Sequence, residues 1–239
     1  MNENVCAVIV TYSGDRLPLL KRSVAGALAA GCRRVLIVDN GSSSAVRSGI
    51  LNMVGKNPES VSFVSLEENR GSAGGFREGI AAFQRDVPEC PFVWLLDDDN
   101  IPEKPALATL FAHWRRLPPG KEGLVTLASF RKDRPFDRQV LLERDIERRF
   151  WRKNSFLGFH GADLPIRLGG SKKNREDGEA VPRDAREIHA GTYGGLFLHR
   201  DLLCRIGYPD EDLFTYQDDT EYTYRIKKSG GASSWSLTA

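Results

Sequence analysis

The fold is decided by one stretch of sequence, residues 92–99, which reads Phe-Val-Trp-Leu-Leu-Asp-Asp-Asp. Its first five residues are apolar, and a short continuous run of this kind is typical of a strand buried on both faces of a parallel sheet. Three carboxylates follow where the strand ends. Because open α/β sheets bind ligands beyond the carboxyl ends of their strands, the stretch predicts a central strand with a site at its end.

Other apolar runs of strand length precede this strand in the sequence. They are residues 5–11, 35–38 and 61–66, and the first two lead into Thr11 and into Asp39-Asn40. Apolar residues at helical spacing predict a helix over 17–30, and further helices are predicted over 71–82, after the glycine-rich run, and over 102–114, after the triple aspartate. Farther along, the pattern predicts a strand within 191–199 and helices over 200–206 and 220–228. This alternation predicts an α/β fold with an open, mostly parallel sheet flanked by helices.

Composition excludes several classes of protein. The 239 residues carry 34 Lys and Arg against 32 Asp and Glu, and a net charge of +2 gives no general argument for binding nucleic acid. No apolar run approaches the roughly 20 residues of a membrane span. The N-terminus lacks the features of a secretory signal, so we expect a cytoplasmic protein. The four cysteines are scattered, which predicts buried free thiols and neither a zinc site nor a disulfide framework.

The triple aspartate is a candidate metal site. If the chain stays extended, Asp97 and Asp99 point to the same face, and two converging carboxylates suit a hard divalent cation such as Mg²⁺ or Mn²⁺. The alternative is an acidic turn that caps the helix near Pro102. A single aspartate suffices for a cap, so three favour the metal.

Two further motifs carry possible chemistry. Residues 69–75 read Asn-Arg-Gly-Ser-Ala-Gly-Gly. Glycines at the start of a helix let the backbone approach a ligand, and together with an arginine they suit a phosphate group. The alternative is an ordinary glycine-rich turn, which is common without a ligand. Asp218 and Asp219 precede another predicted helix. Taken alone, these two carboxylates fit a general base and a helix cap equally well.

Taken together, these motifs resemble the family 2 glycosyltransferases with the GT-A fold. The resemblance runs through Ala-Val-Ile-Val-Thr-Tyr at 7–12, Leu-Ile-Val-Asp-Asn-Gly-Ser-Ser at 36–43, the glycine-rich run and the triple aspartate. It resumes at Gly-Gly-Leu-Phe-Leu from residue 194 and ends in the segment 213–226. Within the family, the motifs are most similar to the galactofuranosyl- and rhamnosyltransferase branch.

The resemblance implies a role for each matched residue. The implied donor-binding residues are Thr11, Asp39, Asn40, Arg70, Gly71 and Asp97. Asp97 and Asp99 would hold a divalent metal, Mn²⁺ or Mg²⁺. Asp219 would be the catalytic base, with Asp218 as the alternative, and Gly194-Gly195 would border the acceptor.

The implied activity is an inverting, metal-dependent transfer. A sugar would move from a UDP- or dTDP-sugar to a hydroxyl of a glycan or lipid-linked acceptor, as in the biosynthesis of a cell-envelope polysaccharide. The whole chain, 1–239, would form one GT-A domain, with a donor half at 1–114 and an acceptor half at 115–239. Residues 131–153 mix basic and apolar side chains, which predicts possible peripheral contact with the inner face of a membrane.

The end of the chain departs from the family pattern. Many members continue after the segment matching 225–228 with another strand and a histidine that completes the metal site. Residues 229–239 do not match that pattern, and His189 and His199 lie too early. The sequence therefore leaves open a sugar-nucleotide-binding protein without transfer activity. A nucleotidyltransferase is a weaker alternative, because residues 11–15 lack its usual Gly-rich loop with Arg after the first strand. A phosphatase of the haloacid type would carry its Asp-x-Asp after the first strand.

Overall fold

The structure is a computed structural model that describes residues 3–12, 14–121, 123–129, 186–188, 191–215 and 217–236. The chain divides into two compact units, residues 1–130 with 184–239, and residues 131–183. The second unit, with the predicted membrane-contacting segment, lies outside the described residues. A single domain spanning 1–239 therefore stays a prediction, and the fold below is that of the first unit.

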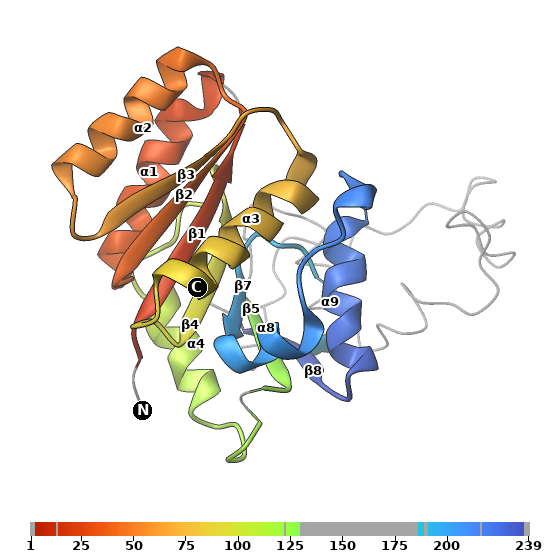
Figure 1. Cartoon of the computed structure of the whole chain (residues 1–239). Coiled ribbons are helices and arrows are strands. Elements are labelled where there is room, and N and C mark those ends of the chain that lie inside the picture. The colour runs from red at the N-terminus through yellow and green to blue at the C-terminus, as the bar shows by residue number, and fades with distance from the viewer. Residues whose placement is uncertain are drawn as a thin grey trace, which may run out of the picture. The chain divides into compact units, whose positions relative to one another are not determined.

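The described strands of the first unit form one eight-stranded sheet in the order β3-β2-β1-β4-β7-β5-β8-β6 (Figure 1). They are β1 (Val5–Thr11), β2 (Arg34–Asn40), β3 (Val61–Leu66), β4 (Phe92–Asp97), β5 (Val125–Ser129), β6 (Arg186–Ile188), β7 (Leu196–His199) and β8 (Ala232–Ser236). The first four pair in parallel, and β7 is antiparallel to β4 and β5. The predicted α/β fold with an open, mostly parallel sheet is confirmed.

Six α-helices and two short 3-10 helices accompany the described strands. They are η1 (Gly14–Arg16), α1 (Leu17–Ala30), α2 (Ser44–Lys56), α3 (Gly71–Asp86), α4 (Ala106–Trp114), α8 (Arg200–Ile206), η3 (Glu211–Leu213) and α9 (Asp218–Lys228). The predicted bounds of α1 and α8 are confirmed. The helix predicted over 102–114 is shorter than expected, and its predicted start at Pro102 is wrong, because α4 begins at Ala106, after Pro105. The sequence analysis missed α2, although Val46 and Ile50 are buried at helical spacing.

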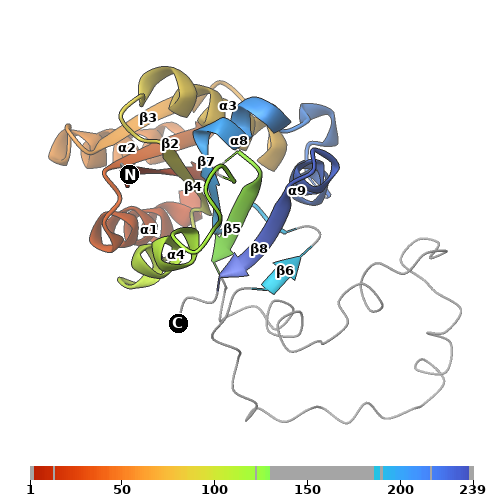
Figure 2. The same cartoon turned by 90° about the horizontal axis from the view of Figure 1, so that it is seen from below.

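The helices cover both faces of the sheet. Figure 2 shows α1 and α4 on one side of the sheet and α3 and α8 on the other. On β1, Val5, Ala7 and Ile9 belong to the core cluster that includes α1, α2 and α4. Val8 faces α3 instead, and a Cβ on Gly79 of that helix would lie 2.5 Å from its Cγ1. The absence of a side chain at this position lets α3 pack closely on the strand that leads to Thr11.

An aromatic cluster anchors β4 and so fixes the strand that carries the triple aspartate. The Phe92 ring stacks on Phe197 of β7 at 5.0 Å and meets Phe111 and Trp114 of α4 edge to face. Trp94 is 1% exposed, and its indole N–H donates to the Gly195 carbonyl. Such rings dominate core energetics, so β4 and β7 are held rigidly against each other.

The cysteine prediction is confirmed for three of the four thiols. Cys6, Cys32 and Cys90 are buried and free, and burial raises the pKa of the Cys32 thiol to about 12. Cys204 is exposed, so the prediction is wrong for this residue. It lies on α8, on the side of the helix away from the buried Leu202 and Leu203.

The sequence analysis expected residues 229–239 to lack the further strand of the family pattern, and this expectation is wrong. A strand does follow α9, because Ala232–Ser236 forms β8, which pairs in parallel with β5 and antiparallel with β6. Its sequence, Ala-Ser-Ser-Trp-Ser, has little apolar character, so the strand depends on its two neighbours in the sheet.

Candidate active site

The carboxyl ends of adjacent strands bring predicted site residues together. The parallel register places Thr11 of β1 beside Asp39 of β2, and Val10 beside Asp97 of β4. Three of the predicted positions therefore lie at one edge of the sheet, where α/β proteins bind ligands. Their contacts with a ligand stay predictions.

The middle residue of the triple aspartate is the buried one. Asp98 is 2% exposed, and its carboxylate accepts hydrogen bonds from the Thr11 hydroxyl at 2.7 Å and from Arg16 Nε at 2.6 Å. Arg16 also pairs with Asp99 at 3.0 Å. The hydrogen bond to Asp98 raises the pKa of Arg16, and the ion pair compensates the burial of the carboxylate. The Thr11 hydroxyl thus has a partner inside the protein, and Arg16 is a residue that the sequence analysis missed.

The chain does not stay extended through the triple aspartate. β4 ends at Asp97, and the Asn100 N–H donates to the Asp97 carbonyl at 3.0 Å, which closes a turn. The argument that strand alternation places Asp97 and Asp99 on one face is therefore wrong, because alternation holds only in extended chain. Their assignment as metal ligands now rests on the family resemblance and stays a prediction.

The residues around Asp97 offer oxygen atoms suited to a hard cation. A Cβ on Gly194 would clash with both Asp97 Oδ2 and Asn100 Oδ1 at 2.5 Å, so a glycine is needed for the loop to pack against these two oxygens, and the Asn100 oxygen already accepts from the Asp97 N–H at 2.8 Å. Mg²⁺ and Mn²⁺ prefer such oxygens and commonly take few protein ligands beside substrate phosphates. Within the described part of the chain, no three His, Cys, Asp or Glu side chains form a metal cluster. Asp97 and Asp99 as ligands of a divalent metal therefore stay a prediction.

Asp39 and Asn40 are buried and organise the loops around them. The Asp39 carboxylate accepts from the Ser42 N–H at 2.9 Å, Arg47 Nε at 2.9 Å and the Ser65 hydroxyl at 3.0 Å. Burial alone would raise the pKa of Asp39, but these hydrogen bonds outweigh it and hold the pKa below its usual value.

The Asn40 side chain holds the start of the glycine-rich run. Its amide donates to the Gly71 carbonyl at 2.8 Å and accepts from the Arg70 N–H at 3.0 Å. The residue is 2% exposed, so these contacts are made in the interior. In the described structure, Asn40 positions Arg70 and Gly71 through its side chain.

The first turn of α3 is covered by another loop. Gly71 has a φ of +69°, and a Cβ there would lie 2.1 Å from the Phe214 carbonyl oxygen, so only glycine fits. The Ala73 N–H donates to that same oxygen at 3.1 Å, and the Gly71 N–H donates to Asn69 Oδ1. Because these donors already have partners, the expectation that this helix start offers open N–H groups to a phosphate does not hold for them.

Arg70 belongs to an ion-pair group with η3. Its guanidinium contacts Glu211, and Arg77 from the next turns of α3 binds the other Glu211 oxygen at 2.7 Å. The Arg77 guanidinium also lies over the Tyr208 ring, 5.5 Å from its centroid. Two cations thus meet one carboxylate here, which ties α3 to η3.

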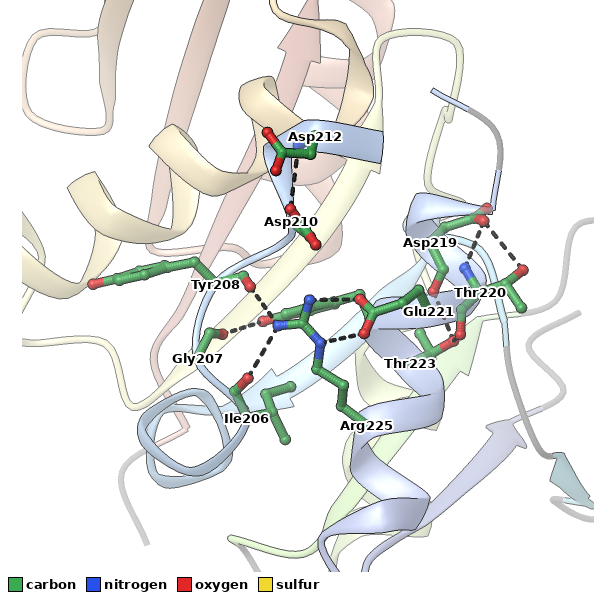
Figure 3. A network of polar contacts seen from close by, with 11 residues as sticks. Ile206, Gly207, Tyr208, Asp210, Asp212, Asp219, Thr220, Glu221, Thr223 and Arg225 are labelled. Atoms are coloured by element: carbon green, nitrogen blue, oxygen red, sulfur yellow. Dashed lines mark hydrogen bonds and ion pairs between the residues drawn. The ribbon is translucent and has the colours of Figure 1, made fainter. Parts of the chain in front are cut away.

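The two predicted bases open helix α9 and have different environments. Asp218 is 3% exposed and accepts a hydrogen bond from the Ser72 hydroxyl at 2.6 Å. Asp219 is partly exposed, and its Oδ1 accepts from the Thr220 N–H at 2.6 Å (Figure 3). Burial therefore distinguishes the two carboxylates, and the more accessible one is Asp219.

Helix α9 is held in place one turn farther on. Arg225 binds Glu221 through two nitrogens at 2.6 and 2.5 Å and donates to the Tyr208 carbonyl at 2.7 Å, as Figure 3 shows. This bidentate pair, which the sequence analysis did not single out, fixes the helix against the loop after α8.

One short loop, residues 191–195, joins two acidic groups, the triple aspartate 97–99 and the pair Asp218–Asp219. At one end, the Gly191 N–H donates to the Thr223 hydroxyl of α9 at 2.9 Å. At the other end, Gly194 lies against Asp97, and the Gly195 N–H donates to the Leu95 carbonyl of β4. The loop thus links the carboxyl end of β4 to the first turns of α9.

The comparisons with known proteins agree with this arrangement. The family model for glycosyl transferase family 2 matches residues 6–167. The chain therefore belongs to glycosyl transferase family 2 and is a glycosyltransferase. A curated relative, the galactofuranosyltransferase GlfT1 of Mycolicibacterium smegmatis, is 27% identical over 242 residues, which cover 99% of this chain and 70% of the relative.

Solved structures of glycosyltransferases share the fold. The mannosyltransferase PcManGT of Pyrobaculum calidifontis, in complex with GDP-Man and Mn²⁺, matches with a TM-score of 0.62 and 19% identity over the whole of this chain and 57% of its own. GalNAc-T7 with UDP, GalNAc and Mn²⁺ matches with a TM-score of 0.65 and 13% identity over 98% of this chain and 41% of its own. The chain thus spans about half the length of these structures, and the predicted GT-A fold is confirmed.

The described residues include no helix that is both long and apolar enough to cross a membrane.

Proposed function

We propose that this glycosyltransferase moves a sugar with inversion from a nucleoside diphosphate to a hydroxyl of a glycan or lipid-linked acceptor. One observation carries the proposal: the loop 191–195 joins Asp97, at the predicted donor end, to helix α9, whose first turn carries the predicted base Asp219. A transferase needs a donor site and a proton acceptor side by side, and this loop supplies the connection.

The chemistry follows from the positions of these carboxylates. The Asp219 carboxylate takes the proton from the acceptor hydroxyl while that oxygen forms a bond to the anomeric carbon. The bond from this carbon to the diphosphate oxygen breaks, and the nucleoside diphosphate leaves. Asp39, with a lowered pKa, stays ionised and is the proposed acceptor for the nucleoside, although in the free chain its carboxylate is buried and bound by Ser42, Arg47 and Ser65. Thr11 and Asn40 keep this end of the pocket in shape through their internal contacts.

A divalent metal, Mn²⁺ or Mg²⁺, would neutralise the charge that develops on the leaving diphosphate. Asp97 and Asp99 would hold it, with the Asn100 oxygen close to Asp97. Two similar structures contain Mn²⁺ together with a nucleotide or nucleotide sugar, which supports this assignment. Arg70 and Arg77 would add positive charge on the donor side.

We propose galactofuranose as the first sugar to test, on the similarity of the chain to a relative. The relative that covers almost the whole chain is a galactofuranosyltransferase, and the motifs in residues 69–75 and 97–99 are similar to that branch. UDP or dTDP would carry the sugar. Such a transfer belongs to the building of a cell-envelope polysaccharide on the inner face of the membrane.

The test is a panel of nucleotide sugars with the purified chain and Mn²⁺. We expect UDP-galactofuranose to raise the melting temperature more than GDP-mannose or dTDP-rhamnose, and to be hydrolysed slowly to UDP without an acceptor. Asp99→Asn should lose both effects, whereas Asp86→Asn, at an exposed ion pair with Arg85, should keep both. Binding without turnover by any donor would favour a binding protein, and pyrophosphate release from a nucleoside triphosphate and a sugar phosphate would favour a nucleotidyltransferase.

A further inference from the structure

Tyr193 lies at the centre of the loop that joins the two acidic groups. The residue is 3% exposed, and its ring packs on Phe76 of α3 at 4.4 Å and on Tyr222 of α9 at 5.8 Å between centroids. The ring therefore contacts both helices whose first turns carry predicted site residues. None of the motifs singled out in the sequence includes Tyr193.

The hydroxyl of Tyr193 is buried and has no hydrogen-bond partner among the described residues. The neighbouring Tyr222 is a useful contrast, because it is equally buried and its hydroxyl donates to the Gly207 carbonyl at 3.1 Å. Buried hydroxyls are normally paired, so an orphan needs an explanation. Orphan donors of this kind occur where a partner arrives only in another state of the protein.

Asp218 lies one turn before Tyr222 on the same face of α9, and its partner Ser72 lies one turn before Phe76 on α3, so the Tyr193 ring packs next to this pair. Asp218 is 3% exposed, and within the described chain its carboxylate accepts one hydrogen bond, from Ser72. Its negative charge, after burial itself, is the largest contributor to the raised pKa of the Tyr193 phenol, ahead of Tyr222 and Asp219, while Arg225 acts in the opposite direction. The phenol thus stays protonated and is a donor beside a carboxylate that can accept.

The backbone that leads to Asp218 is strained. Phe214 has a φ of +52° and Gln217 a φ of +65°, and neither is a glycine. Backbone strain of this kind concentrates at active sites, ligand clamps and switch segments. The Phe214 carbonyl is also the one that covers the first turn of α3. Filling of the donor side would therefore bear directly on the segment 214–218.

We propose that Tyr193 is a positioning residue: in the reacting complex its hydroxyl donates a hydrogen bond to the Asp218 carboxylate and so fixes the first turn of α9, which carries Asp219. Catalytic hydrogen bonds that are absent or long in a free enzyme often form only with substrates bound. The inference rests on the proposed function, because it assigns Asp219 the role of base.

The test compares Tyr193→Phe with the matched control Tyr222→Phe, since both keep their rings and lose one hydroxyl. The rate is that of UDP-galactofuranose hydrolysis at saturating donor with Mn²⁺, and the affinity is measured by calorimetry. For Tyr193→Phe we expect kcat to fall about 10- to 100-fold, with donor affinity and melting temperature unchanged. For Tyr222→Phe we expect a lower melting temperature and an unchanged kcat, because only a structural bond is lost.

Three results would overturn the inference. A kcat of Tyr193→Phe within twofold of the wild type removes the positioning role. A loss of donor affinity at unchanged kcat makes the hydroxyl a sugar contact, and a fall in melting temperature like that of Tyr222→Phe makes it structural. A wild type that turns over no donor is a separate outcome, because it rejects the proposed function itself and the inference with it.

Discussion

Arg16 Nε donates to Asp98 Oδ1 at 2.6 Å, and this pair ties the turn after β1 to the turn after β4. Asp98 is almost fully buried, whereas the Arg16 side chain is about a quarter exposed. The carboxylate depends on this arginine and on the Thr11 hydroxyl for its compensation. The geometry of the turn after β4 therefore rests on Arg16, which also pairs with the predicted metal ligand Asp99.

Arg16→Ala should lower the free energy of unfolding by about 2–3 kcal/mol, because it leaves a buried carboxylate without its cation. Urea denaturation measures the change. The control is Arg85→Ala, which breaks a pair with Asp86 whose side chains are both at least half exposed, and should change the stability far less. Equal midpoints for the two variants would contradict the structural role of Arg16.

Gly71→Ala should be strongly destabilising and should displace the segment that begins at Phe214. The new Cβ would meet the Phe214 carbonyl oxygen at 2.1 Å, and the left-handed φ of +69° adds strain. Gly55→Ala is the control, because a Cβ there meets nothing within 4 Å, and in a helix it should stabilise by about 0.5–1 kcal/mol. Thermal unfolding distinguishes the two, and a Gly71→Ala variant as stable as the wild type would show that the contact is easily relaxed.

Asp39→Asn should flatten the dependence of stability on pH in the acid range. The pKa of Asp39 is lower in the folded chain than the value of about 3.9 for an unfolded aspartate. Its stabilising contribution is therefore complete above about pH 4–5 and is lost as the pH falls through the folded pKa. Melting temperatures between pH 7 and pH 2.5 test this, and wild-type and variant curves that stay parallel would contradict it.

Asp219→Asn should abolish transfer and leave the affinity for UDP with Mn²⁺ nearly unchanged, because the variant loses the proton acceptor and keeps its shape. Product formation and calorimetry measure the two properties. Asp212→Asn, at an exposed carboxylate of η3, is the control and should keep both. A loss of UDP affinity in Asp219→Asn would instead assign this residue a structural role in the donor pocket.

Asp99→Ala should remove the part of UDP binding that depends on Mn²⁺. Asp99 is partly exposed and pairs with Arg16, so the substitution should change the fold little. Calorimetry with Mn²⁺ and with EDTA gives the metal-dependent part directly. Unchanged binding in Mn²⁺ would remove Asp99 from the metal site and leave Asp97 as the candidate ligand.

Much of the sheet could be predicted from the sequence because its central strands are continuous apolar runs. β1 and β3 have the predicted bounds, and β2 and β4 differ from them by one or two residues. β8 could not be predicted, because Ala-Ser-Ser-Trp-Ser has no strand pattern of its own and forms a strand through its pairing with β5 and β6. The local sequence also could not indicate that Asn100 closes a turn on Asp97 and so ends the extended chain.

The sequence by itself determined the fold class, the family motifs and the acidic strand ends, because these depend on runs of neighbouring residues. Only the tertiary structure shows which of the neighbouring carboxylates are buried and which partners they have. Asp98 is buried by Thr11 and Arg16, which lie more than 80 positions away in the chain, and Asp218 by packing against Ser72. The orphan hydroxyl of Tyr193 also became visible only there. Burial and hydrogen bonding arise from contacts between distant segments, and these contacts give chemically identical side chains different roles.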